Sequence, residues 1–89
     1  MSSARPTLTL LGKPDCHLCQ LMREVVAGVL PRYRARLEER DIRDDPELER
    51  RYLVEIPVLL AGDREVARHT ATREQLVERL DSLLGRSPL

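Results

Sequence analysis

Two cysteines three positions apart, Cys16 and Cys19, stand between two contrasting apolar patterns. Before them, residues 7–11 (TLTLL) form a short run that ends at Gly12, which is typical of a buried strand. After them, apolar side chains recur every three or four positions and predict a helix with one apolar face. These side chains are Leu18, Leu21, Met22, Val25, Val26, Val29 and Leu30. The cysteines are therefore expected where a strand turns into a helix.

Proline and charged residues mark the middle of the chain. Pro31 predicts the end of the first helix. Residues 36–42 (RLEERDI) predict a strand, and because their charges fall on both faces, an edge position in a sheet suits them. Asp45 offers an N-cap and Pro46 a first-turn proline, so we expect a short helix from there to Leu53.

The last third of the chain predicts a hairpin followed by a helix. Residues 55–60 (EIPVLL) and 64–68 (REVAR) predict two antiparallel strands joined by a turn. Thr72 begins a capping-box pattern, and Gly85 predicts the end of the helix. The apolar stripe between them consists of Leu76, Val77, Leu80, Leu83 and Leu84. Because crossovers between parallel strands are right-handed, the first two strands are expected to be parallel.

The composition limits what else the chain can be. A length of 89 residues is enough for one modest core, so we expect a single domain over 1–89 with an ordered core of about 7–85. Fifteen basic residues balance fifteen acidic ones, and Tyr33 and Tyr52 are the only aromatics. Neither nucleic acid nor a membrane is therefore an expected partner. The first apolar run is too short for a signal peptide or a membrane span, so we expect a cytoplasmic location. We also expect the protein to be a monomer.

The position of Cys16 predicts its chemistry. Free backbone N–H groups and the helix dipole at a helix start favour the thiolate, which is the nucleophilic form of cysteine. Cys19 lies one turn further on, where it should be more buried and able to attack a mixed disulfide on Cys16. The pattern therefore predicts reversible dithiol–disulfide exchange, with Cys16 attacking and Cys19 resolving. His17, when protonated, and Lys13 would add positive charge beside Cys16, while Asp15 would oppose it.

Other uses of the two cysteines remain open. Zinc requires four ligands, and the chain offers only Cys16, Cys19, His17 and His69, so we expect no metal within one chain. A metal or cluster shared between two chains would make the protein a binding module. The cysteines could also be a structural pair, or a sensor of oxidants without turnover. His69 is interpreted as a surface residue.

The sequence resembles the thioredoxin superfamily, and more closely the small bacterial glutaredoxin-like proteins. Three segments carry the resemblance: TLTLLGKPDCHLC, ERDIRDDPELERRY and EIPVLLAGDREVARH. It implies an α/β fold of the thioredoxin-like or glutaredoxin-like type, with the element order βαβαββα. The four-stranded mixed sheet would have the order 2-1-3-4. Three helices would flank it, the first and third on one face and the second on the other.

The resemblance also implies a substrate site. The Ile56–Pro57 peptide bond would be cis and lie beside Cys16, with the backbone of Ile56 paired to a bound peptide or glutathione. Lys13 would bind a carboxylate, and His17–Leu18 stands where glutathione-using members carry Pro-Tyr. The implied substrates are protein or small-molecule disulfides, and the implied reductant is glutathione or a thioredoxin-type reductase. No tightly bound cofactor is implied.

Overall fold

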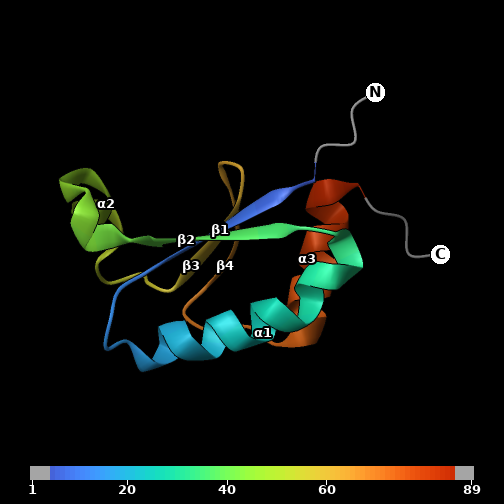
Figure 1. Cartoon of the computed structure of the whole chain (residues 1–89), viewed down its shortest axis with the longest axis horizontal. Coiled ribbons are helices and arrows are strands. Elements are labelled where there is room, and N and C mark those ends of the chain that lie inside the picture. The colour runs from blue at the N-terminus through green and yellow to red at the C-terminus, as the bar shows by residue number, and fades with distance from the viewer. Residues whose placement is uncertain (1–4, 86–89) are drawn as a thin grey trace.

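The computed structural model describes residues 5–85 as a four-stranded mixed sheet with helices packed on both faces (Figure 1). The predicted domain's ends, residues 1–4 and 86–89, lie outside this range. The elements are β1 (Thr7–Gly12), α1 (His17–Tyr33), β2 (Arg36–Asp41), a 3-10 turn (Ile42–Asp44), α2 (Pro46–Tyr52), β3 (Val58–Ala61), β4 (Arg64–Arg68) and α3 (Arg73–Leu84). The strand order β2-β1-β3-β4 confirms the expected sheet. As expected, β1 is parallel to β2, and β3 is antiparallel to β4.

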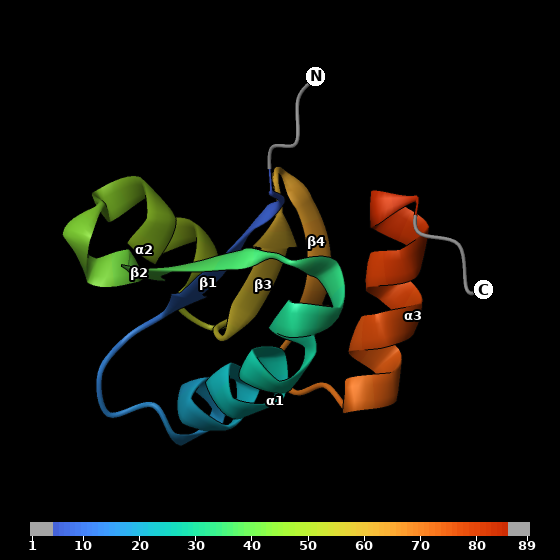
Figure 2. The ribbon, with the colours of Figure 1, turned by 45° about the vertical axis from the view of Figure 1, so that its right-hand side comes forward.

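The two faces of β1 bury different helices. Leu10 belongs to a cluster with α1 and α3, which lie next to each other in Figure 2. Leu11, the next residue, points to the opposite face and belongs to a second cluster that Leu48 and Tyr52 of α2 cover. Successive side chains of a strand alternate between faces, so one short apolar strand anchors both layers. The second cluster also contains Cys19.

Helix α1 buries a narrower stripe than the sequence predicts. The buried side chains are Cys19, Met22, Val26, Val29 and Tyr33. Leu18 is 39% and Leu21 42% exposed, so these two members of the predicted apolar face lie outside the buried stripe. Each residue turns a helix by about 100°, and these two positions fall on the flank of the stripe that begins at Cys19.

Pro31 does not end α1, which continues to Tyr33. A proline removes one helical hydrogen bond, and near the last turn few bonds remain to be lost. The helix ends when Arg34 adopts a left-handed conformation and its N–H donates to the carbonyls of Leu30 and Pro31. The predicted end of the helix is therefore corrected by two residues.

Two predicted strands are also shorter in the structure. The strand predicted over 36–42 ends at Asp41, because Asp41 Oδ1 accepts the backbone N–H of Arg43 (2.9 Å) and starts the 3-10 turn. The strand predicted over 55–60 begins only at Val58. Residues 55 and 56 do not extend the strand, because both of their N–H groups donate to Tyr52 O. The predicted capping box at Thr72 and the left-handed Gly85 are both present.

The Tyr33→Phe substitution tests how α1 is joined to α3. The buried Tyr33 hydroxyl lies 2.8 Å from Asp81 Oδ1 and 3.1 Å from Val77 O. Losing this hydroxyl should lower the free energy of unfolding by about 1 kcal/mol, the usual net value of a hydrogen bond. Urea denaturation at neutral pH measures the change. Tyr52→Phe is the matched control, because no described residue hydrogen-bonds its hydroxyl, and it should leave the midpoint unchanged.

The wild-type and Tyr33→Phe proteins should also differ in how their stability changes with pH in alkaline solution. Burial, followed by the hydrogen bond to Asp81, raises the pKa of Tyr33 above its usual 10.0. The folded state then holds this proton more tightly than the unfolded chain does. The stability due to neutral Tyr33 is thus present below pH 10 and is lost as the pH rises through the folded pKa. If the free energy of unfolding of Tyr33→Phe falls with pH as steeply as that of the wild type above pH 10, this account is contradicted.

Candidate active site

Cys16 is the N-cap residue of α1, and Cys19 lies behind it. The Sγ atom of Cys16 accepts the backbone N–H of Cys19 at 3.2 Å, and the first turn of α1 contains no acidic residue. The two cysteines form a disulfide with their Cα atoms 5.2 Å apart. Cys16 is partly buried, whereas Cys19 is only 3% exposed. An incoming group therefore reaches Cys16 more easily, and a thiolate there would have a backbone donor.

The turn between β1 and α1 brings the cysteines close to the sheet. Asp15 adopts a left-handed conformation (φ 60°), which Asp tolerates better than most residues. At the end of β1, a Cβ atom on Gly12 would lie 3.0 Å from Cys19 Sγ and 3.4 Å from Cys19 Cβ. Gly12 thus allows the sulfur of Cys19 to rest directly on the backbone of β1.

Gly12→Ala should therefore destabilise the disulfide form. The added methyl group would push Cys19 away from β1, and overpacking of this kind costs about 1–3 kcal/mol. Gly28→Ala in α1 is the matched control, because its Cβ would meet only the end of Arg73, at 3.7 Å. Replacing a helical glycine by alanine should stabilise by about 0.5–1 kcal/mol. Equal urea midpoints for the two variants would show that Cys19 does not press on β1.

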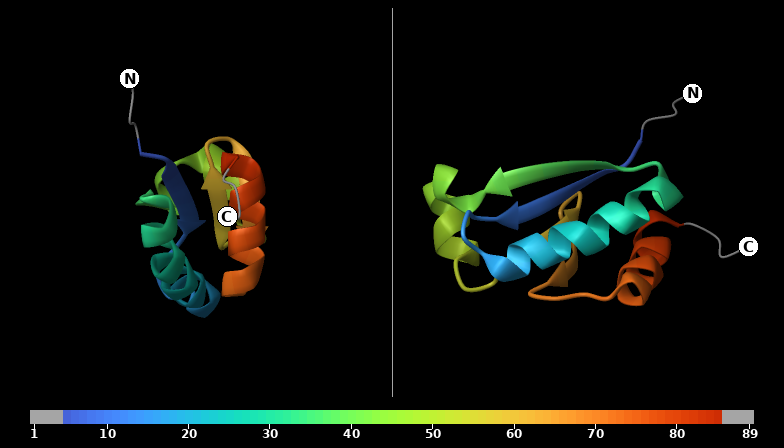
Figure 3. Two further views of the ribbon diagram at one scale, coloured as in Figure 1. Left: turned by 90° about the vertical axis from the view of Figure 1, so that its right-hand side faces the viewer. Right: turned by 60° about the horizontal axis from the view of Figure 1, so that its bottom comes forward.

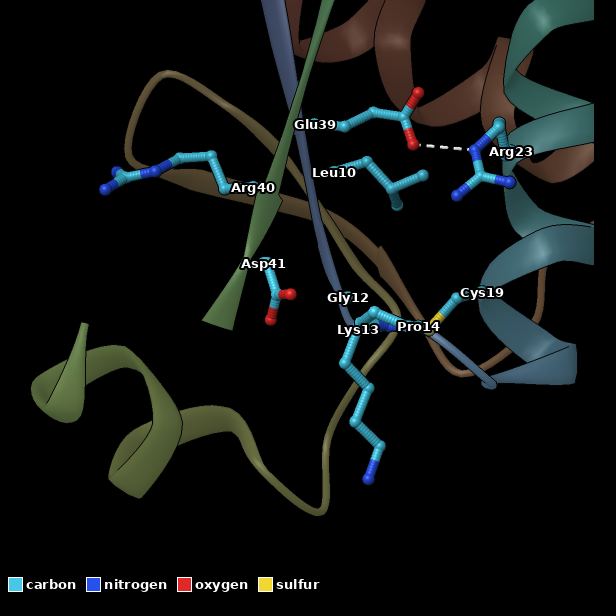
Figure 4. Close-up of a pocket in the computed structure, with 9 residues that line it drawn as sticks. All are labelled: Leu10, Gly12, Lys13, Pro14, Cys19, Arg23, Glu39, Arg40 and Asp41. Atoms are coloured by element: carbon cyan, nitrogen blue, oxygen red, sulfur yellow. Dashed lines mark hydrogen bonds and ion pairs between the residues drawn. The ribbon is translucent and has the colours of Figure 1, made fainter. Parts of the chain in front are cut away.

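The two sulfurs face two different pockets. We call the one beside Cys19 the inner pocket; its volume is about 280 Å³ (Figure 4). Its lining consists of Leu10, Gly12, Lys13, Pro14, Cys19, Arg23, Glu39, Arg40 and Asp41. The outer pocket beside Cys16 has a volume of about 520 Å³. Its lining consists of Lys13, Pro14, Asp15, Cys16, His17, Gln20 and Arg23.

Charged residues separate and border these pockets. Arg23 lines both of them, and its Nε donates to Glu39 Oε1 at 2.6 Å, which joins α1 to β2 (Figure 4). Asp41 is engaged by Arg43, whose hydrogen bonds lower the pKa of the Asp41 carboxyl. Lys13 borders both pockets, and its side chain extends away from the Arg23–Glu39 pair (Figure 4). Among the described residues Lys13 has no ion-pair partner, so its charge is open to a ligand.

The other predicted site residues lie on separate elements around the disulfide. His17 and Leu18 are exposed in the first turn of α1. Ile56 and Pro57 are buried just before β3, and the peptide bond between them is cis. Ile56 and Cys19 belong to one apolar cluster, against which Cys16 packs. The loop before β3 and the start of α1 lie at the same end of the molecule (Figure 3).

The N–H of Ile56 already has a hydrogen-bond partner within the chain. It donates to Tyr52 O at 3.1 Å, at the end of α2. A bound strand could therefore pair only with the carbonyl of Ile56 unless this bond breaks. That the backbone of Ile56 pairs with a bound peptide or glutathione stays a prediction.

Charged residues from β4 hold the loop before Pro57. Arg68 forms ion pairs with Glu55 and Glu65, which raise its pKa, and its hydrogen bonds lower the pKa of the Glu65 carboxyl. The N–H of His69 donates to Pro57 O at 2.8 Å. The His69 side chain is half exposed, as expected for a surface residue, but its backbone supports the loop.

Some residues around the pockets escaped the sequence-based prediction. Arg23 follows Cys19 by four positions, so helical spacing alone could have placed it beside the sulfur. Glu39 and Asp41 reach the inner pocket only because they lie opposite Leu10 and Gly12 in the β1–β2 pair. That register depends on the fold, and no local signal in the sequence reveals it.

A match to a protein-family model shows which family the chain belongs to. The model of the family described as glutaredoxin-like domain (DUF836) matches residues 7–81. The chain belongs to this glutaredoxin-like family. Its residues fit a redox-type role in general, because the fold brings Cys16 and Cys19 together at the start of α1. No curated protein matches the chain.

Solved structures share the fold of this glutaredoxin-like chain. Target protein XcR50 from X. campestris is 30% identical, with a TM-score of 0.66, and the match covers 91% of this chain and 99% of that one. Protein Ne2328 from Nitrosomonas europaea is 23% identical, with a TM-score of 0.70 and coverages of 88% and 94%. Thioredoxin 1 from Thermosipho africanus is 15% identical, with a TM-score of 0.63 and coverages of 89% and 94%. The fold is therefore thioredoxin-like.

Within residues 5–85, which the structure describes, no helix has the length and apolar character needed to cross a membrane. Within the same range, no group of three or more His, Cys, Asp or Glu side chains is arranged to hold a metal ion.

Proposed function

We propose that the chain is a thiol–disulfide oxidoreductase in which Cys16 attacks and Cys19 resolves. The observation that carries this proposal is the contact between Cys16 Sγ and the N–H of Cys19 at the start of α1. A backbone donor at this point stabilises negative charge on Cys16, both as a thiolate and as a leaving group. The burial of Cys19 keeps it away from substrates but within reach of Cys16.

The reaction has two exchange steps. First, the Cys16 thiolate attacks one sulfur of a substrate disulfide, so that a Cys16–substrate disulfide forms and the other substrate thiolate leaves and takes up a proton. Cys19 then loses its proton and attacks Cys16 Sγ, and the second substrate thiolate leaves. Two electrons pass from the cysteine pair to the substrate. The reverse sequence oxidises a dithiol and reduces the pair.

The surroundings of Cys16 suggest the substrates. The large apolar side chains that are exposed in the described range are Leu18, Leu21, Leu53 and Val54. They belong to α1 and to the segment before β3, and the start of α1 lies at the same end of the molecule as this segment (Figure 3). We propose protein disulfides as substrates, with small-molecule disulfides as the alternative. The uncommitted Lys13 would bind a substrate carboxylate, and glutathione or a thioredoxin-type reductase would restore the thiols.

The test is a turnover assay combined with metal analysis. The reduced protein should lose two thiols for each peptide disulfide it reduces, and should turn over repeatedly when one of the two reductants is supplied. Stoichiometric zinc or iron in anaerobically purified protein, together with unreactive thiols, would favour a binding module. One round of oxidation without turnover by either reductant would favour a sensor.

A further inference from the structure

We propose that His69 is a positioning residue that keeps Cys19 out of the reach of substrates. It does so by fixing residues 53–57, which we call the wall loop, against the apolar cluster around the buried sulfur. This inference rests on the proposed function, in which only Cys16 meets the substrate disulfide and Cys19 attacks afterwards.

The wall loop contributes to the apolar cluster that buries Cys19. Ile56 and Cys19 belong to the same cluster, in which Ile56 is 8% and Cys19 3% exposed. The start of the loop lies at the surface, where Leu53 is 46% and Val54 79% exposed. Segments with few buried apolar contacts open locally at a low cost in free energy. The protection of Cys19 therefore depends on what fixes the wall loop.

His69 holds the wall loop at two points, one on each side of Ile56. Its backbone N–H donates to Pro57 O at 2.8 Å, and its ring atom Nε2 lies 3.3 Å from Val54 O. A carbonyl oxygen only accepts hydrogen bonds, so Nε2 carries the proton of this bond. The carboxylate of Glu55, 3.8 Å from Nε2, favours a proton at the same position.

The other tethers of the wall loop do not hold the carbonyl of Val54. The N–H groups of residues 55 and 56 donate to Tyr52 O, and Arg68 pairs with the side chain of Glu55. Among the described residues, only the ring of His69 hydrogen-bonds Val54 O. Losing this ring would therefore free the exposed start of the loop.

The backbone of His69 is strained. Its φ is 67°, in the left-handed region, and the N–H of Thr70 donates to Arg68 O across it at 2.8 Å. A hydrogen bond across one residue with positive φ closes a γ-turn of the strained kind. Such conformations persist only where the surrounding contacts enforce them. Glycine would adopt this backbone without strain, but it would leave Val54 O without its donor.

Labelling of the reduced protein with iodoacetamide tests the proposal through His69→Gly. This variant removes the ring and relieves the strained backbone, so its urea midpoint should stay close to that of the wild type. Without the ring, the wall loop opens more often. Labelling of Cys19 should become about three- to tenfold faster, the effect of one lost hydrogen bond on a local opening. Labelling of Cys16 at the helix start should change by less than about twofold.

Two further variants separate the role of the ring from that of the backbone. His69→Gln retains a side-chain N–H of similar reach on the same strained backbone, and should return Cys19 labelling to within about twofold of the wild type. Arg34, at the end of α1 opposite the cysteines, is also left-handed, with φ 52°. Arg34→Gly relieves strain there without touching the wall loop, and should leave the labelling of both cysteines unchanged.

Cys19 labelling at the wild-type rate in His69→Gly would overturn the proposal. Labelling of His69→Gln as fast as that of His69→Gly would also overturn it, as would faster Cys19 labelling in Arg34→Gly. Exchange of a peptide disulfide by the wild-type protein is measured separately. If this exchange is absent, the proposed function has failed, whereas the labelling rates still decide whether His69 protects Cys19.

Discussion

Cys16→Ser is expected to reduce disulfide exchange to the uncatalysed background, whereas Cys19→Ser should keep the first step and stop at the mixed disulfide. A serine hydroxyl is not a nucleophile towards disulfides at neutral pH, and Cys16 is the sulfur at the open end of the site. Without Cys19, the substrate stays attached to Cys16 until an external thiol releases it. Stopped-flow kinetics with a peptide disulfide and mass spectrometry of the quenched protein measure both effects.

The two serine variants control for each other, since each removes the same disulfide and leaves one thiol. Their unfolding midpoints should be similar, so a difference in reactivity would reflect position alone. Exchange at the wild-type rate by Cys16→Ser would contradict the assignment of the attacking thiol. A mixed disulfide that forms as fast on Cys16→Ser as on Cys19→Ser would contradict the role of burial.

Leu59→Ala is expected to have the largest effect on stability. Leu59 is fully buried in β3, opposite Leu10 of β1 and Ala67 of β4, so its side chain lies at the centre of the sheet. Truncating a buried leucine costs about 2–5 kcal/mol. That is a large share of the free energy of unfolding of a whole domain, which is typically about 5–15 kcal/mol. Urea denaturation of the oxidised protein, followed by circular dichroism, measures the loss.

Leu53→Ala is the matched control for this substitution. Leu53 is 46% exposed at the end of α2, and its truncation should change the free energy of unfolding by less than about 0.5 kcal/mol. Similar midpoints for the two variants would mean that the core is not centred on β3. A large loss for Leu53 alone would assign it a packing role that its exposure does not indicate.

The sequence was most informative where one pattern had one physical meaning. The capping box at Thr72 and the cap at Asp45 each place a helix start, because only a few side chains can accept the free N–H groups there. The apolar run of β1 and the stripe of α1 likewise predict their elements. Because Cys16 lies between that run and that stripe, local patterns alone are enough to place it at a helix start.

The errors occurred where tertiary contacts decide. The spacing of Leu18 and Leu21 fits a buried stripe, but the packing of α1 on the sheet selects the positions one residue later. The strand expected from Glu55 begins only at Val58. The N–H groups of residues 55 and 56 donate to Tyr52 O and are not available for strand pairing. The lining of the inner pocket could not be predicted, because it depends on the register between β1 and β2. The order of residues along the chain does not reveal that register.

Competitive alkylation of the reduced wild-type protein tests the central claim most directly. A limiting amount of iodoacetamide is added at neutral pH, and peptide mass spectrometry counts the label on each cysteine. Cys16 lies at the helix start with a backbone donor, and Cys19 is buried behind it, so Cys16 should react at least about tenfold faster. Equal labelling of the two cysteines, or faster labelling of Cys19, would contradict the account.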